Sequence, residues 1–203
     1  ISSTAVTWSY ASRSIESPEL SKKYAAGIII ASAIMFPRLA LLTYIFNSAL
    51  FMYVAIPFAV FSLMCLIISL ILIKEDTNKP DTNFKLGNPM NLLNAIGFGV
   101  IYVVILIAVF YSNQFFGESG LYYSALIAGL ADTDAITISL AKFASDGERI
   151  KLASSVVVTA VMSNMLVKLV ISVFKGSQNT GKIVGYTFLG IIVIGVLYAM
   201  IAN

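Results

Sequence analysis

GLADTDAITISLAKFA, residues Gly129–Ala144, places two carboxylates, Asp132 and Asp134, inside a stretch with strongly apolar flanks. The flanks LYYSALIAGL (121–130) and AITISLA (135–141) are hydrophobic enough to lie in a bilayer. An ionisable side chain at that depth costs roughly 2.5–3.5 kcal/mol on insertion scales, and is therefore a candidate functional group. This stretch predicts an all-α polytopic membrane protein with an acidic site inside the membrane.

The composition supports a membrane protein and excludes several kinds of function. Hydrophobic residues make up 59% of the chain and charged residues 11%, against about 25% charged in soluble domains. The chain has no histidine and a single cysteine, Cys65, which excludes His-ligated zinc, a Cys–His catalytic pair and an intramolecular disulfide. The net charge of +3 does not indicate nucleic acid, so the lipid bilayer is the predicted partner. Because GxSxG, P-loop and HExxH motifs are absent, we expect no enzyme activity.

Apolar stretches of about 20 residues or more predict about six transmembrane helices, which follow a short N-terminal half-helix at residues 1–14. They are expected near residues 25–46, 49–73, 90–111, 121–143, 150–174 and 182–202. We interpret residues 1–203 as one transmembrane domain with halves at roughly 1–111 and 112–203. The chain begins with Ile1 in what looks like the middle of a helix, so a fragment of a longer protein is expected.

The basic residues predict an orientation. With six spans, the loops 12–24, 74–89 and 142–151 fall on one side of the membrane and carry most of the lysines and arginines. The other side has only Lys175 and Lys182. By the excess of basic residues in cytoplasmic loops, the first three loops and the C-terminus are predicted to be cytoplasmic.

Two pairs of similar segments predict an internal repeat. SSTAVTWSYA (2–11) aligns without gaps on DTDAITISLA (132–141), and AGIIIASAIM (26–35) resembles ASSVVVTAVM (153–162). Since three full spans would separate the copies, both should run in the same direction, as parallel repeats about an axis along the membrane normal. The first copy has Ser2 and Thr4 where the second has Asp132 and Asp134.

The aspartates can share one ligand only if the helix is interrupted. On a continuous helix they would point about 200° apart, whereas a break at Gly129–Asp132 would let both face one cavity. Gly129 is a weak helix former and Asp132 a good N-cap, so a broken helix at 121–143 is expected. Asp132 and Asp134 then predict a cation or proton site, with Mg²⁺ as a candidate, because hard cations prefer oxygen ligands. Alternatively, one aspartate caps the second half-helix and the other pairs with a buried base. The positive end of that half-helix would also oppose a cation.

Further side chains are candidates to complete the site. Lys168, with Asn164 one turn before it, is predicted to partner the aspartates, and Arg38 beside Pro37 plays the analogous part in the first copy. These groups would balance charge in transport, or form fixed structural pairs, and Lys168 could also extend toward the end of its span. Neutral oxygen ligands are expected among Ser3, Thr4, Thr133 and Thr137.

The two repeated motifs, together with SAIMFPR (32–38) and SNMLVK (163–168), resemble the domain of unknown function 4010. This is a prokaryotic integral-membrane family, often joined to an N-terminal MgtC/SapB-like membrane domain. The resemblance covers nearly the whole chain and implies a multi-pass protein of the prokaryotic inner membrane. Through the partner domain it implies a loose link to Mg²⁺ homeostasis, but no settled activity. The family has a glycine-rich half-helix before SSTA that this sequence lacks.

Two functions follow as hypotheses. The first is transport or homeostasis of an inorganic cation, Mg²⁺ or proton-coupled, through the acidic site at the middle of the membrane. The second is a non-transporting assembly or regulatory module, whose buried charges only fix helix packing. Such a module would act with an MgtC/SapB-like domain or as a homo-oligomer.

Overall fold

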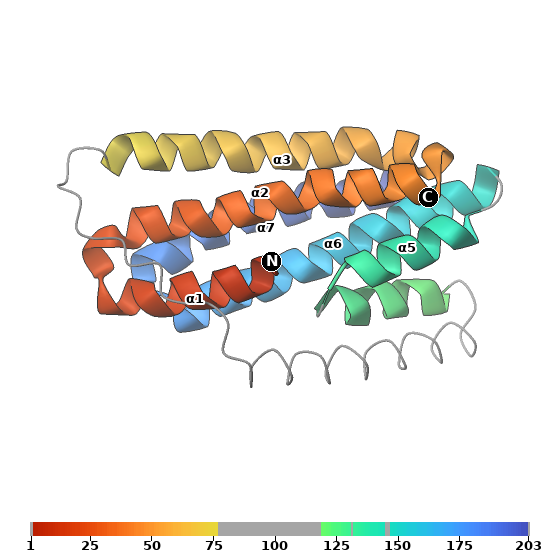
Figure 1. The fold of residues 1–203 in the computed structure, drawn as a ribbon. Helices are drawn as coiled ribbons and strands as arrows, with labels where there is room; N and C mark the ends of the chain where they lie inside the picture. The colour runs from red at the N-terminus through yellow and green to blue at the C-terminus, as the bar shows by residue number, and fades with distance from the viewer. Residues whose placement is uncertain (1, 77–118, 131, 145–146, 203) are drawn as a thin grey trace.

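The computed structural model describes residues 2–76, 119–130, 132–144 and 147–202, and all regular structure within these ranges is helical (Figure 1). The span predicted at 90–111 lies outside the described residues. The helices are α1 (Ser3–Glu16), α2 (Ser21–Phe46), α3 (Ser48–Asp76), an unlabelled helix (Ser119–Leu130), α5 (Asp134–Phe143), α6 (Gly147–Lys175) and α7 (Gln178–Ala202), with a 3-10 turn at Pro18–Leu20.

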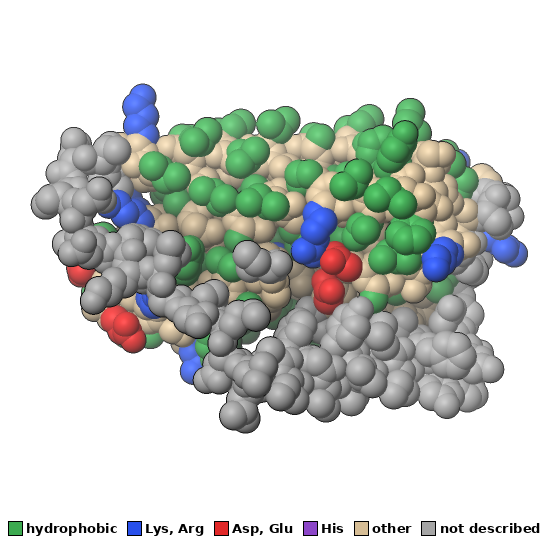
Figure 2. Space-filling view, in the orientation of Figure 1, with side chains coloured by type: hydrophobic (Ala, Val, Ile, Leu, Met, Phe, Trp, Pro, Cys, Tyr) green, Lys and Arg blue, Asp and Glu red, His purple; other side chains and the backbone are tan. Residues whose placement is uncertain are grey.

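Four helical segments are long and apolar enough to cross a membrane, which confirms the helical membrane class. They are Pro18–Phe46, Ser48–Glu75, Arg149–Lys175 and Gln178–Ile201, and they coincide with four of the six predicted spans. Large hydrophobic side chains lie exposed along them, as Figure 2 shows for one face of the molecule. Such a surface suits lipid chains as solvent.

Residue Asn47 explains how α2 turns sharply into α3. Its backbone leaves the helical conformation, and its side-chain oxygen accepts a hydrogen bond from the backbone N–H of Leu50 at 3.0 Å, as an N-cap does. Its amide nitrogen donates to the carbonyl oxygens of Ala141, at 3.0 Å, and Ala144, at 2.6 Å. One polar residue therefore starts α3 and also holds the end of α5, whose last carbonyls lack partners within the helix.

The long helices form two antiparallel pairs, α2 with α3 and α6 with α7. Lys22 near the start of α2 pairs with Glu75 near the end of α3 at 2.7 Å. The hydroxyls of Ser21 and Ser177 lie 2.8 Å apart, so the start of α2 meets the turn between α6 and α7. Helix α6 therefore runs antiparallel to α2.

The predicted interruption is present, because helix Ser119–Leu130 ends before α5 begins at Asp134. The chain also reverses direction there. Near the start of the first helix, Tyr122 hydrogen-bonds with Ser155, and near its end Gly129 accepts from Asn164. The first helix therefore runs parallel to α6. Helix α5 instead runs parallel to α2, from Arg38 at its start to Asn47 at its end. Residues 119–143 therefore form a helical hairpin, and the prediction of one crossing at 121–143 is wrong.

This reversal also overturns the predicted direction of the two similar segments. Helix α1 starts beside Met35, inside α2. Near its other end, Ser14 accepts a hydrogen bond from the backbone N–H of Ser177, which lies beside the start of α2. Helix α1 therefore runs antiparallel to α2. Because α5 runs parallel to α2, the segments 2–11 and 132–141 point in opposite directions (Figure 1). The prediction of parallel copies counted the broken helix at 121–143 as one crossing of the membrane. Because the chain reverses there, the second copy runs in the opposite direction.

The basic residues are distributed differently for the same reason. Lys142 lies over the ring of Phe46 at the end of α2, with its nitrogen 5.4 Å from the ring centroid, and α6 begins at this end as well. The opposite end of the bundle carries Arg13, Lys22, Lys23, Lys74, Lys175 and Lys182. Among the described residues, the loop 142–151 thus lies at the opposite end of the bundle from the loop 12–24, so these two loops do not share a side as the predicted orientation required.

Cysteine labelling should confirm this arrangement. In a Cys65→Ala background, Lys74→Cys and Lys142→Cys should react with a membrane-impermeant thiol reagent from opposite sides of the membrane. The helix directions put these exposed positions at opposite ends of the bundle. Both variants should react equally after permeabilisation, and labelling of both from one side would contradict the hairpin.

Candidate functional site

Two short helices begin inside the depth of the bundle and approach each other from opposite directions. Helix α1 starts at Ser3, whose hydroxyl lies 3.9 Å from the sulfur of Met35, and α5 starts at Asp134, which contacts Arg38. Met35 and Arg38 both lie within α2, away from its ends. The N-terminal ends of α1 and α5, each of which carries the partial positive charge of its helix dipole, therefore meet the same part of α2.

Asp134 forms an ion pair with Arg38. Nη2 of Arg38 lies 2.8 Å from Oδ1 of Asp134, and the two side chains are 41% and 30% exposed in this chain. The pair joins α2 to the start of α5, and its carboxylate also suits the positive end of that helix. The predicted pairing of the aspartates with Lys168 is not observed, because Asp134 pairs with Arg38 and the Lys168 ammonium contacts Ser32 and Met35 instead.

Asp132 stabilises the turn of the hairpin. Its Oδ1 accepts a hydrogen bond from the backbone N–H of Asp134 at 3.3 Å, the local bond typical of Asp in turns. Thr133 is the N-cap residue of α5 by position, and its side chain makes no capping bond. Asp132 thus binds the first backbone N–H of α5, as a cap would, but from the residue before the N-cap position. Asp132 makes no ion pair within the described ranges.

Asn164 carries an unpaired oxygen at the hairpin. Its Nδ2 donates to the carbonyl oxygen of Gly129 at 2.9 Å, close to the break between the two short helices. Its Oδ1 is buried without a hydrogen-bond partner, as is the hydroxyl of Thr137, one turn into α5. Unpaired buried oxygens are rare in native proteins and require an explanation such as an ion or an ordered water.

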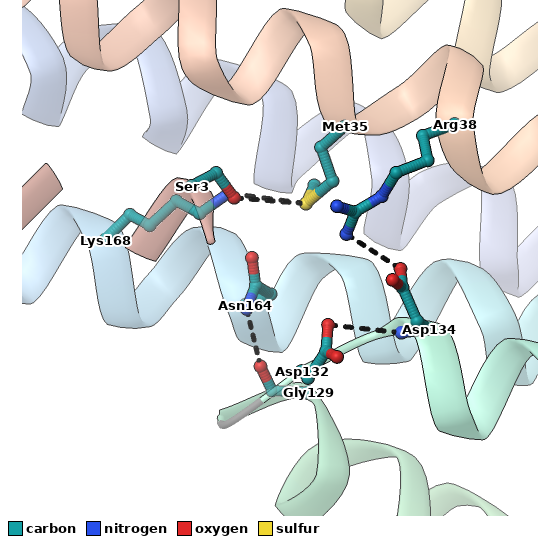
Figure 3. A network of polar contacts seen from close by, with 8 residues as sticks. All are labelled: Ser3, Met35, Arg38, Gly129, Asp132, Asp134, Asn164 and Lys168. Atoms are coloured by element: carbon teal, nitrogen blue, oxygen red, sulfur yellow. Dashed lines mark hydrogen bonds and ion pairs between the residues drawn. The ribbon is translucent and has the colours of Figure 1, made fainter. Parts of the chain in front are cut away.

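Lys168 lies one turn after Asn164 on α6 and is fully buried. Its ammonium contacts the hydroxyl of Ser32 at 3.4 Å and the sulfur of Met35 at 3.3 Å. In Figure 3, Lys168 and Asn164 from α6, Arg38 from α2 and Asp132 from the turn before α5 lie around one region beside Met35. We call Asp132, Asn164, Lys168, Ser3, Met35 and the Arg38–Asp134 pair the central cluster.

The structure thus brings most of the sequence-predicted candidates together. Thr133 and Thr137 are buried at the start of α5, and Thr4 is half-buried in the first turn of α1. Ser32 and Met35 were not predicted, although both belong to the segment SAIMFPR (32–38) of α2, because a serine and a methionine in an apolar span look like packing residues. Among the described residues, no three Asp, Glu, Cys or His side chains gather as metal ligands.

Fold and site define a helical membrane protein whose polar centre lies where two short helices begin inside the helical bundle. The chain belongs to the family described as domain of unknown function (DUF4010), which matches residues 1–176. It is also 31% identical over 181 residues to an uncharacterized protein of Aquifex aeolicus (strain VF5), covering 88% of this chain and 79% of the relative. No solved structure matches the chain.

Proposed function

We propose that this protein transports an inorganic cation across the membrane through the central cluster. The observation that carries the proposal is the unpaired, buried Oδ1 of Asn164 beside a hairpin turn that also holds the Asp132 carboxylate. Both groups are oxygen ligands of the kind that hard cations bind. Charged and polar groups inside a membrane normally mark a path for ions or substrates.

The arrangement of the helices supports transport. Transporters with inverted repeats bind their substrates near the middle of the membrane, where discontinuous helices begin and end. We propose that α1–α3 and α5–α7 are such inverted copies. In support, α1 packs against α6 and α5 packs against α2, while α2 contacts α7 and α3 contacts α6. Exchanging the two halves preserves this set of contacts.

The number of available carboxylates bears on which cation is carried. Asp134 is held by Arg38, so only Asp132 has a carboxylate outside an ion pair in this cluster. This set suits a monovalent cation or a proton-coupled step as well as Mg²⁺, which often keeps most of its waters. The link to an MgtC/SapB-like domain remains a prediction, and it keeps Mg²⁺ in the test panel.

The orientation is proposed from the revised positions of the basic residues. We propose the inner membrane of a prokaryote, with the end of the bundle that carries Lys22, Lys74 and Lys182 in the cytoplasm. The C-terminal end of α7 would then lie on the opposite side, contrary to the prediction from sequence. The labelling experiment above, performed on sealed vesicles of known orientation, tests this proposal.

A second candidate, the non-transporting module, is favoured by the interactions of the two aspartates. The Arg38–Asp134 pair fixes α5 against α2, and Asp132 stabilises the hairpin turn. Both contacts are what a purely structural role requires. The same chain would then act through a membrane partner or a second copy, and would show no flux by itself.

Cation flux distinguishes the two candidates. Liposomes containing the protein should take up one cation from a panel of Na⁺, K⁺, Mg²⁺, Mn²⁺ and H⁺, and Asp132→Asn should reduce that flux at least about tenfold. Asparagine keeps the oxygen that accepts from Asp134 N–H, so the hairpin should fold while the charge is lost.

Equal insertion and thermal stability of the two proteins are the control. Flux by Asp132→Asn at the level of the native chain would remove Asp132 from the path. No flux of any cation by the native chain would support the module.

A further inference from the structure

The central cluster contains more strong hydrogen-bond donors than acceptors on the side of Lys168 and α1. The ammonium of Lys168 and the hydroxyl of Ser3 both point at one acceptor, the sulfur of Met35, at 3.3 Å and 3.9 Å. A thioether sulfur is a weak acceptor. The remaining partner of Lys168 is the Ser32 hydroxyl, which itself donates to the carbonyl of Ile28.

The charges around Lys168 do not balance this excess. Asp134 is paired with Arg38, Asp132 accepts from a backbone N–H, and neither forms an ion pair with Lys168. The first turn of α1 adds the positive end of its dipole and backbone N–H groups that have no partner inside the helix, of which that of Ala5 donates to the Ser2 hydroxyl. Ser3, in that first turn, contacts the same sulfur as Lys168. Within the part of the chain that the structure describes, this fully buried ammonium forms no ion pair with an anionic group, which buried charges require.

We propose that Lys168, Ser3 and the start of α1 bind a small oxyanion, either inorganic or a carboxylate, as a second substrate of the transporter. The proposal rests on the proposed transport function and adds a substrate class to it. Lys168 and Ser3 donate to the anion's oxygens, while the unpaired Oδ1 of Asn164 remains with Asp132 as a ligand of the cation. The Asp132 side of the cluster keeps the cation, so positive and negative charges move together.

Met35 occupies the place of the anion in this conformation. Its side chain is almost fully buried, and its sulfur bridges the two donors, Lys168 and Ser3. Methionine is unbranched and flexible, so rotation of its side chain releases both donors without moving a helix. The open groove of about 440 Å³ elsewhere in the bundle is lined mainly by apolar residues such as Leu126, Met162 and Ile192. The hydroxyls that also line it, those of Tyr122, Thr159 and Ser163, donate to acceptors within the protein, and no charged side chain of the described residues lines it.

Thermal stability of the purified full-length protein measures the binding directly. Phosphate, hydrogen carbonate, sulfate, acetate and lactate are tested as sodium salts, with chloride as the reference. At 100 times its dissociation constant, a bound oxyanion should raise the melting temperature by about 5 °C or more. Inorganic ions and carboxylates are separate arms, so the responding arm identifies the source of the oxyanion.

Three variants test the site. Lys168→Met removes the charge at similar length and should abolish the shift. Met35→Glu places a carboxylate beside Lys168, and should raise the basal melting temperature while abolishing the shift, so it remains informative if Lys168→Met does not fold. Met35→Leu, which replaces the thioether with an uncharged branched side chain, should keep the shift.

Other outcomes overturn the proposal or separate it from the cation site. No shift with any oxyanion, or an equal shift in Met35→Glu, contradicts the anion site. Asp132→Asn should retain the anion-induced shift although it loses cation flux. Failure of the cation proposal alone is thus distinguishable from failure of the anion site.

Discussion

Replacing Arg38 with methionine should destabilise the protein by about 2–3 kcal/mol and reduce the amount inserted and folded. In the native protein the carboxylate of Asp134 lies 2.8 Å from the guanidinium of Arg38. The variant leaves this carboxylate without a cation at the start of α5. Breaking a fully buried pair costs about 3–5 kcal/mol, and we expect less here because both side chains are partly exposed. An aspartate inside a membrane without its partner also costs roughly 2.5–3.5 kcal/mol on insertion scales.

Adding Asp134→Asn to Arg38→Met should restore much of the lost stability. With the charge removed, asparagine remains as a polar group beside the N-terminus of α5, and no unpaired ion is buried. The native protein, Arg38→Met, Asp134→Asn and the double variant together form a double-mutant cycle. Their free energies of unfolding in mixed detergent micelles give the interaction energy of the pair. If the double variant were as unstable as the sum of the two single variants, Arg38 and Asp134 would contribute independently, and the pair would not fix α5 against α2.

The interruption of the hairpin could be predicted because its causes are local. Gly129 and Asp132 disfavour a continuous helix whatever surrounds them, and the structure shows the gap between Leu130 and Asp134. Local preferences do not determine the direction in which the chain leaves the break. That direction depends on long-range contacts such as Asn164 with Gly129, and the sequence does not reveal them. The prediction of parallel copies failed at this step.

The choice of ion-pair partner was also beyond the sequence. Lys168 and Arg38 are both single basic residues in apolar spans, so either could face the aspartates. Both α2 and α6 pack against α5, and the pairing is decided by which basic side chain lies at the start of α5, which is Arg38 of α2. The hydrogen bonds of Lys168 to Ser32 and Met35 are similarly invisible in the sequence, because neither side chain is chemically unusual in a membrane helix.

Gly129→Ala should disrupt the hairpin more strongly than its single added methyl group suggests. A Cβ at position 129 would overlap the backbone carbonyl oxygen of Ala160 and lie 2.8 Å from the Cβ of Ser163, both in α6. A backbone atom cannot rotate away, so the helix Ser119–Leu130 must move outward from α6. Overpacking typically costs about 1–3 kcal/mol, and here it also threatens the hydrogen bond from Asn164 to the carbonyl of Gly129.

The matched control is Gly190→Ala in the middle of α7, where an added Cβ meets no atom within 4 Å. Alanine favours helix over glycine by about 0.5–1 kcal/mol, so this variant should be neutral or slightly stabilising. Thermal unfolding and cation flux should therefore separate the two glycines, with both properties reduced in Gly129→Ala alone. Because Gly129 lies outside the proposed ligands, loss of flux there would show that ion binding depends on the seating of the hairpin against α6. Equal behaviour of the two variants would mean that the helix Ser119–Leu130 is not held at this distance, and the position of Asp132 in the central cluster would lose its support.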